Sequence, residues 1–268
     1  METGKIGFIG LGNMATAMIG GMLGKHVVEA GNIIGKARTK ATEEMVKTKF
    51  NIEIAESNAK VAAGSDILFL AVKPIFFPEV IAEIREAVRP GTLIVSIAAG
   101  RTLSYLQSAF DREDCKIIRC MPNTPALVLE GCTGVCADEK VSEEELNRIL
   151  TLLNAFGKAI VVPERLMDVV VGVSGSAPAY VFLFIEAMAD EAVAEGMPRA
   201  QAYEFAAQAV LGSAKMVLET GKHPGELKDM VCSPGGTTIQ AVKVLEEMGL
   251  RAAVMDAMEA CIEKSRNM

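Results

Sequence analysis

The sequence predicts an α/β domain with a doubly wound, mostly parallel sheet, followed by an all-α domain. Short apolar runs alternate with helix-like segments up to residue 162, and beyond it the pattern is helical throughout. Such alternation is typical of a parallel sheet covered by helices, whereas a run of helices alone indicates a separate helical unit. We therefore expect one domain over residues 1–162 and a second over residues 163–268.

The composition is that of a folded protein with an acidic surface. The chain has 268 residues, half of them hydrophobic, and a formal net charge of −7. This length allows one large core or two modest ones. The acidic balance argues against a nucleic-acid partner or an anionic membrane surface, because both attract a basic face.

The apolar segments are too short to suggest a membrane span. The window 177–185 is followed by Glu186 and Asp190, whereas a span needs roughly 20 apolar residues. The chain begins Met-Glu-Thr-Gly, without the basic start of a leader. We expect a cytoplasmic protein that enters no membrane.

The cysteines and histidines do not form a metal-ligand pattern. The six cysteines, at positions 115, 120, 132, 136, 232 and 261, include no Cys-x-x-Cys pair, and there are two histidines, His26 and His223. We expect free, buried thiols in a reducing compartment and no metal site.

The stretch 5–15 predicts the turn of a dinucleotide site. An apolar run breaks into G-x-G-x-x-A at Gly10, Gly12 and Ala15. The first glycine would permit a tight turn, the second would admit a pyrophosphate, and the alanine would let helix and strand pack closely. A helix beginning near Asn13 would offer free backbone N–H groups to the phosphates. The motif alone also fits a structural turn, but a second strand follows at the distance that a βαβ unit requires.

That second strand, 32–37, ends in cations rather than in an acid. NAD enzymes place Asp or Glu here to bind the ribose 2′-hydroxyl, whereas this chain has Lys36, Arg38 and Lys40. Arg38 can bind a phosphate through two N–H groups, and the hydroxyl of Thr39 can donate as well. The turn therefore favours NADP(H) over NAD(H), with a solvated basic turn as the alternative.

The other elements follow in order. Further strands are expected at 52–55, 66–72, 93–98, 116–120, 133–137 and 158–162, with helices at 41–50, 77–88, 103–110 and 143–156. The second half predicts helices at 164–173, 177–195, 199–220, 237–248 and 250–265. The run 66–72 is apolar throughout, as a strand buried on both faces requires. Ser142 and Glu145 form a capping box at the start of the helix that follows them.

Small residues and prolines mark the carboxyl ends of several strands. Pro74 ends the strand 66–72 and holds Lys73 extended. Ala99 and Gly100 close the strand 93–98, and two prolines stiffen the loop that carries Asn123. Open α/β sheets bind ligands outside the carboxyl ends of their strands, so we expect the coenzyme at this edge.

A second glycine turn lies in the helical half. Ser233-Pro-Gly-Gly-Thr-Thr238 stops one element and frees the backbone at two glycines, and a helix begins at its threonines. Such a turn presents a group of N–H donors to a small anion. Because the first turn takes phosphate, we expect this one to take a substrate carboxylate. His223, which precedes Pro-Gly, is expected to cap a turn or helix rather than to act as an acid.

Together these motifs resemble the pyrroline-5-carboxylate reductase family. The resemblance rests on Gly10–Met14, Ala71–Pro74, Met121–Pro125, Ser174–Tyr180, Leu227–Asp229 and Ser233–Thr238, and it spans Ile6 to about Met258. The last motif is the specific one, since the others fit several dehydrogenase families. The resemblance implies reduction of 1-pyrroline-5-carboxylate to L-proline by NAD(P)H, the final step of proline synthesis.

The resemblance also implies roles for individual residues. Coenzyme contacts are expected at Gly10, Leu11, Gly12, Asn13, Met14, Arg38, Thr39, Asn58, Ala71, Val72, Lys73, Pro74, Ala98, Ala99, Gly100 and Asn123. Substrate contacts are expected at Ser174, Ser176, Gly235, Gly236, Thr237 and Thr238. Thr238 is the suggested catalytic residue, as hydrogen-bond partner of the ring nitrogen. Many relatives have Ala at the position of Thr237, so its hydroxyl is a departure from the family pattern.

The helical half is also expected to form dimers. The helix 177–195 is apolar nearly all round its first half, which indicates burial on several sides. The family resemblance implies intertwined homodimers, often assembled into decamers of five dimers. An ordinary central helix of a monomer is the alternative.

The chemistry of a cyclic imine agrees with a site built from glycines and threonines. An imine can arrive protonated, so the enzyme needs orientation and a carboxylate anchor more than a strong acid. The nearest rival is a β-hydroxyacid dehydrogenase, which would use Lys215 or Lys228, although neither lies in a matching motif. A non-catalytic NADP-binding protein is the other rival, and it would not need the turn 233–238.

Overall fold

The structure is a computed structural model that describes residues 4–268 and divides into two compact units. One unit runs to Ser176 and includes Cys261–Met268, and the other comprises Ala177–Ala260. The division falls later than the end of the last strand, because the segment after that strand packs on the sheet. Met167 is fully buried there, and Gly134 leaves the space that Val170 fills.

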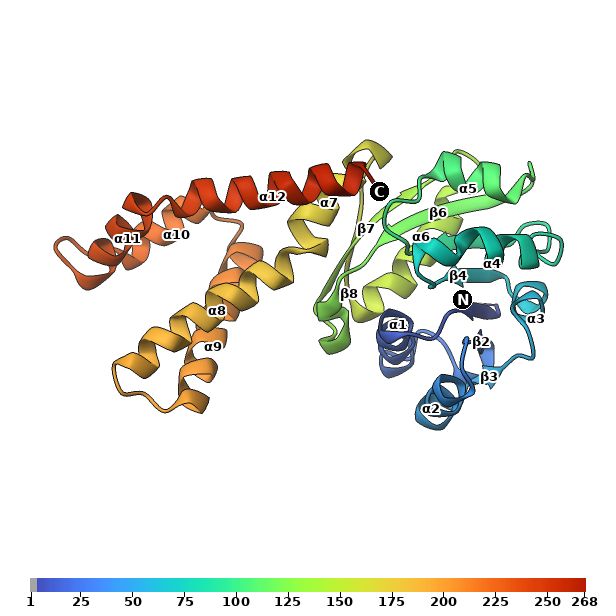
Figure 1. The fold of residues 1–268 in the computed structure, drawn as a ribbon, viewed down its shortest axis with the longest axis horizontal. Coiled ribbons are helices and arrows are strands. Elements are labelled where there is room, and N and C mark those ends of the chain that lie inside the picture. The colour runs from blue at the N-terminus through green and yellow to red at the C-terminus, as the bar shows by residue number, and fades with distance from the viewer. Residues whose placement is uncertain (1–3) are drawn as a thin grey trace. The chain divides into compact units, whose positions relative to one another are not determined.

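The first unit is built on one eight-stranded sheet of order β3-β2-β1-β4-β5-β6-β7-β8 (Figure 1). Its strands are β1 (Ile6–Ile9), β2 (Ile33–Lys36), β3 (Glu53–Ile54), β4 (Ile67–Leu70), β5 (Leu93–Ser96), β6 (Lys116–Met121), β7 (Gly131–Ala137) and β8 (Gly157–Val161). Among the described strands β6 and β7 pair antiparallel, and the other neighbours pair parallel. The mostly parallel, doubly wound sheet is thus confirmed, and its strand order reverses between β1 and β4.

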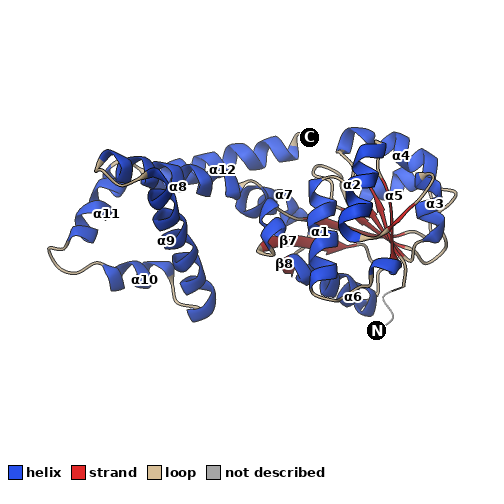
Figure 2. Cartoon of the chain, turned by 90° about the horizontal axis from the view of Figure 1, so that it is seen from below, coloured by secondary structure: helices blue, strands red, loops and turns tan. Residues whose placement is uncertain are grey.

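Helices lie on both faces of this sheet (Figure 2). They are α1 (Asn13–Gly24), α2 (Lys40–Phe50), α3 (Asn58–Gly64), α4 (Phe77–Ile84), α5 (Leu103–Phe110), α6 (Glu143–Leu153) and α7 (Met167–Val170). The capping box of Ser142 and Glu145 is confirmed at the start of α6. Helix α3 was not predicted, because its seven residues are too few to show a helical period.

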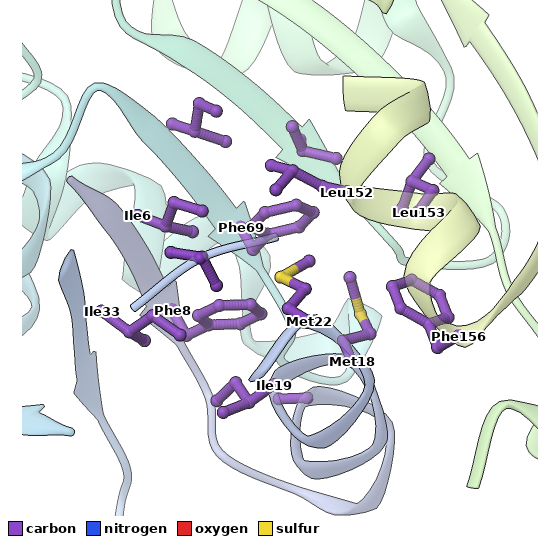
Figure 3. Packing of buried hydrophobic residues seen from close by; sticks show 14 of the residues in the cluster. Ile6, Phe8, Met18, Ile19, Met22, Ile33, Phe69, Leu152, Leu153 and Phe156 are labelled. Atoms are coloured by element: carbon purple, nitrogen blue, oxygen red, sulfur yellow. The ribbon is translucent and has the colours of Figure 1, made fainter. Parts of the chain in front are cut away.

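Two hydrophobic clusters fill the space between the sheet and its helices. Successive residues of β4 alternate between them, with Phe69 in one and Leu68 in the other. Figure 3 shows the first cluster, in which Phe8 and Phe69 of adjacent strands stack with ring centroids 4.8 Å apart. Helices α1, α2 and α6 contribute to this cluster, and α3, α4 and α5 to the other. The layers hold the carboxyl ends of β1, β2 and β4 in fixed register.

The second unit is helical, as predicted. Its elements are α8 (Ala177–Ala194), α9 (Arg199–Thr220), α10 (Pro224–Val231), α11 (Thr237–Glu247) and most of α12 (Leu250–Arg266). Helix α10 was not among the predicted helices, because it opens with Pro-Gly and carries few apolar residues. The expected helix 164–173 is broken instead into a 3₁₀ turn, the short α7 and a π-helical turn over Val171–Gly175.

The sequence predicts no segment long and apolar enough to span a membrane, but the stretch Glu164–Ala194 meets both criteria. By length and composition it could cross a membrane, with a mean hydropathy of 1.6 over its most apolar window, of which 11% is buried. Glu186 and Asp190 therefore do not shorten the apolar run enough to exclude a span. A single stretch of this kind is weak grounds for a membrane, because an apolar face that packs on another protein gives the same signal.

Candidate coenzyme and substrate site

The glycine turn after β1 needs glycine at its first position. Gly10 has φ +95°, and a β-carbon there would lie 2.5 Å from the carbonyl oxygen of Ala71. The backbone N–H of Gly10 donates to the carbonyl of Lys36 at 2.9 Å. The turn is therefore tied to the end of β2 and lies close against the end of β4, where a doubly wound sheet binds nucleotides.

The turn leads into a helix whose first N–H groups have no capping side chain. Gly12 is the N-cap of α1, with φ −75°, and the first turn of α1 contains no acid. A β-carbon on Gly12 would meet nothing within 4 Å, so the space beside it is open. Leu11 and Ala15 are buried beneath the turn, whereas Asn13 is exposed and Met14 is half-buried. These features fit a pyrophosphate at the N-terminus of α1.

The two glycines give a matched pair of substitutions. We expect Gly10→Ala to lower stability by about 1–3 kcal/mol and to weaken NADPH binding, because both its φ and the space beside it exclude a methyl group. Gly12→Ala should keep the wild-type unfolding temperature and still weaken NADPH binding at least tenfold, because its methyl would occupy the phosphate space. Thermal unfolding and NADPH fluorescence titration measure the two effects. Unchanged NADPH affinity in Gly12→Ala would contradict a pyrophosphate at this turn.

The turn after β2 exposes Arg38, Thr39 and Lys40. The guanidinium of Arg38 lies over the ring of Phe76, 5.3 Å from its centroid. The hydroxyl of Thr39 caps α2 by accepting from the N–H of Thr42 at 3.4 Å. Arg38 is therefore free to meet a phosphate from solvent, and Thr39 shapes the start of the helix.

A carboxylate lies at this turn that the sequence had not suggested. Glu43, in the first turn of α2, accepts from the ammonium of Lys36 at 2.8 Å and from the N–H of Ala37 at 3.3 Å. The hydrogen bond from Lys36 lowers the pKa of Glu43. The residue was missed because it stands several positions beyond the strand. Because Glu43 lies in the first turn of α2, the helix brings its side chain back over the turn.

Two further strand ends lie along the same edge of the sheet. Lys73 is extended, as predicted after the strand 66–72, and Pro74 opens a 3₁₀ turn. Ala98 is buried, and Gly100 has φ +69°. Arg101, which no sequence motif marks, donates to the carbonyl of Pro74 at 3.2 Å. It thereby joins the segments Ala71–Pro74 and Ala98–Gly100.

The two asparagines assigned to the coenzyme make hydrogen bonds within the protein. Asn58 begins α3 and donates to Glu83 at 2.7 Å. Asn123 is buried, donating to the carbonyl of Ser174 at 2.9 Å and accepting from the N–H of Cys132 at 2.8 Å. Asn123 therefore fixes the proline-rich loop against β7 and the π-helical turn.

The second unit carries the other glycine turn. Gly235 has φ +68°, and Gly236 is the N-cap of α11 without a capping side chain. A β-carbon on Gly236 would lie 2.3 Å from the hydroxyl oxygen of Ser233. The helix begins at Thr237, as predicted, and its first turn contains no acid. The start of α11 shares with that of α1 a glycine N-cap, no capping side chain and no acid in the first turn, and it fits a small anion.

The remaining substrate candidates, Ser174 and Ser176, belong to the first unit. The hydroxyl of Ser174 donates to the carbonyl of Val170 at 3.1 Å, and that of Ser176 accepts from the thiol of Cys261 at 3.2 Å. Ser174 therefore stabilises the π-helical turn, and Ser176 stabilises its junction with α12. The structure describes these serines and the turn 233–238 within separate units.

The histidines and cysteines have structural settings. His223 caps α10 by accepting from the N–H of Gly225 at 3.0 Å, so its prediction as a cap is confirmed. Burial raises the pKa of Cys136 to about 11, and it also raises the pKa of Cys120. These two thiols stay protonated near neutral pH. Among residues 4–268, no group of three metal-ligating side chains could hold an ion.

Fold and turns together define an NADP-dependent oxidoreductase with a Rossmann unit and a helical unit. Residues 5–100 match the family model described as NADP oxidoreductase coenzyme F420-dependent, and residues 164–268 match that of pyrroline-5-carboxylate reductase dimerisation. The chain is 55% identical to the pyrroline-5-carboxylate reductase of Escherichia coli K12 over 264 residues, 98% of each chain. It belongs to the pyrroline-5-carboxylate reductase family.

Solved structures of this family have the same fold. The pyrroline-5-carboxylate reductase of Coxiella burnetii superposes with a TM-score of 0.93 at 33% identity, over 99% of this chain and 98% of that one. The pyrroline carboxylate reductase of Plasmodium falciparum, solved with NADP bound, gives 0.90 at 32% identity over 100% and 98%. The resemblance seen in the sequence is confirmed, and the β-hydroxyacid dehydrogenase alternative is set aside.

Proposed function

We infer that this chain reduces 1-pyrroline-5-carboxylate to L-proline with NADPH, as the last step of proline biosynthesis. The main support for this function is the turn 233–238, after which α11 starts without a capping side chain. The other motifs of the chain fit several families of dehydrogenases. A protein that only bound NADP would have no use for a second anion-binding helix start. The assay is NADPH consumption on addition of the cyclic imine, and binding of NADPH without its consumption would contradict the proposal.

The coenzyme is assigned to the first unit. Gly10–Met14 would hold the pyrophosphate, Arg38 and Thr39 the 2′-phosphate, and Ala71–Pro74 with Ala98–Gly100 the edge towards the nicotinamide. The fit is supported by the open space beside Gly12, by the uncapped start of α1 and by the exposed guanidinium of Arg38. When bound, the reduced nicotinamide supplies the hydride.

The substrate is assigned to the turn 233–238, with Ser174 and Ser176 as supporting residues. The N–H groups at the start of α11 would bind the carboxylate, which anchors the ring. Thr238, the second residue of α11, would accept from the protonated ring nitrogen or donate to the amine that forms. No strong acid is required at this position, because the imine already carries its proton as an iminium.

The protein is also proposed to form a homodimer in the cytoplasm, with a decamer of five dimers as the larger assembly. Within 177–260, the buried apolar residues are Ala189, Ala202 and Ala206. Large apolar side chains on these helices are exposed, among them Phe182, Leu183, Phe205, Leu218 and Met230. A second helical unit would cover them, as the name of the matching dimerisation family indicates.

This interface can be tested by placing a charge on it. Phe205 is exposed on α9, and we expect it to lie in the apolar interface. Because burying a charge there is costly, Phe205→Glu should shift the mass measured by light scattering towards that of the monomer. Lys215→Ala, also on α9, changes a side chain already in solvent and should leave the mass unchanged. A wild-type protein of monomer mass would contradict the dimer.

A further inference from the structure

The turn after β2 contains an anion-binding position that a carboxylate of the chain itself fills. Lys36 is the last residue of β2, and its ammonium lies 2.8 Å from Oε1 of Glu43. The same oxygen accepts from the N–H of Ala37 at 3.3 Å. A cation and a backbone N–H therefore converge on one carboxylate oxygen, which is the arrangement that binds phosphate.

This ion pair is better shielded than the cations beside it. The side chains of Lys36 and Glu43 are 26% and 12% exposed, whereas Arg38 and Lys40 are exposed residues. Water and salt therefore screen the pair less than they screen a surface pair. The hydrogen bond from Lys36 lowers the pKa of Glu43, so its carboxylate is charged at neutral pH.

The position of the pair is that of coenzyme discrimination. The carbonyl of Lys36 accepts from the N–H of Gly10, so the pair lies beside the glycine turn. In a doubly wound nucleotide-binding sheet, the end of β2 meets the ribose 2′ position. Of the three cations at this turn, Lys36, Arg38 and Lys40, the first is already paired with a carboxylate of the protein.

We propose that Glu43 sets coenzyme preference by competing with the 2′-phosphate of NADPH for Lys36 and the N–H of Ala37. The proposal rests on the proposed function, since that function places the 2′-phosphate at this turn. An incoming 2′-phosphate must either displace the carboxylate of Glu43 or bind to Arg38 while the negative charge of Glu43 repels it. NADH has no phosphate at this position and meets neither cost. Glu43 thus narrows the difference in affinity between the two coenzymes.

The test compares NADPH and NADH dissociation constants of the full chain by fluorescence titration. We expect Glu43→Gln to bind NADPH about five- to tenfold more tightly, because one negative charge is removed at short range, and to bind NADH within about twofold of wild type. The amide oxygen of Gln can still accept from Ala37, so the turn should be kept. Glu44→Gln is the matched control, since it removes the same charge from the next, exposed residue and should leave both constants within about twofold.

Lys36→Met gives a second measurement from the other partner. It leaves the carboxylate uncompensated, so NADPH should bind about five- to tenfold more weakly while NADH changes little. Equal weakening of both coenzymes by Glu43→Gln would mean that the carboxylate only braces the turn, and it would overturn the proposal. An unchanged ratio of the NADPH and NADH dissociation constants in both Glu43→Gln and Lys36→Met would also overturn it. Failure of the proposed function is distinguishable, because the wild type would then not consume NADPH with the imine.

Discussion

Thr238→Ala should lower kcat for pyrroline-5-carboxylate reduction about a hundredfold. Thr238 is the second residue of α11, directly after the turn proposed to hold the substrate carboxylate. A positioned hydrogen-bonding group at the reacting atoms typically contributes two to three powers of ten, which corresponds to about 3–4 kcal/mol. Steady-state kinetics with the imine measures this loss, and the KM for NADPH should stay within about twofold.

Two neighbouring variants separate the hydroxyl of Thr238 from the shape of the turn. Thr238→Ser keeps the hydroxyl and should retain most of the activity. Thr237→Ala removes the same atoms one residue earlier and should change kcat by less than about threefold, because Thr237 is not assigned to the ring nitrogen. Equal losses in Thr237→Ala and Thr238→Ala would show that the turn, and not one hydroxyl, is the sensitive feature.

Arg38→Ala should weaken NADPH about 30- to 100-fold and leave NADH within about twofold. The guanidinium of Arg38 is exposed at the end of β2, over the ring of Phe76, and can hold a phosphate by two parallel hydrogen bonds. Only NADPH has a phosphate at this position. The KM values of the two coenzymes, measured at saturating imine, give the comparison.

Lys40→Ala is the control for Arg38, because it removes an exposed cation from the same turn. We expect it to weaken NADPH binding by less than about threefold, since a fully solvated charge on a flexible side chain contributes little. If Arg38→Ala raised both KM values equally, Arg38 would act on the fold of the turn and the assignment of the 2′-phosphate to it would be contradicted.

The sequence was informative wherever a local pattern decides the structure. The glycine turns were predictable because Gly10 and Gly235 occupy backbone conformations that other residues rarely adopt. The buried strand 66–72 was predictable from its unbroken apolar run, and the start of α6 from its capping box. His223 was read correctly as a cap, because Pro-Gly after it marks the start of a short element.

The sequence was less informative where a contact joins distant segments. The hydrogen bonds of Asn123 to Ser174 and Cys132 depend on how β7 and the π-helical turn pack, and its assignment to the coenzyme stays a prediction. The pairing of Glu43 with Lys36 depends on the direction in which α2 leaves the sheet. Arg101 acts on Pro74, 27 residues away. None of these contacts has a spacing that marks it in the sequence.

A crystal structure of the protein with NADP⁺ and L-proline tests the central assignment most directly. We expect the proline carboxylate to accept hydrogen bonds from the backbone N–H groups at the start of α11, with the ring nitrogen within hydrogen-bond distance of the Thr238 hydroxyl. The pyrophosphate should lie at the start of α1. Proline bound away from the turn 233–238, with that turn unoccupied, would contradict the assignment of the substrate site.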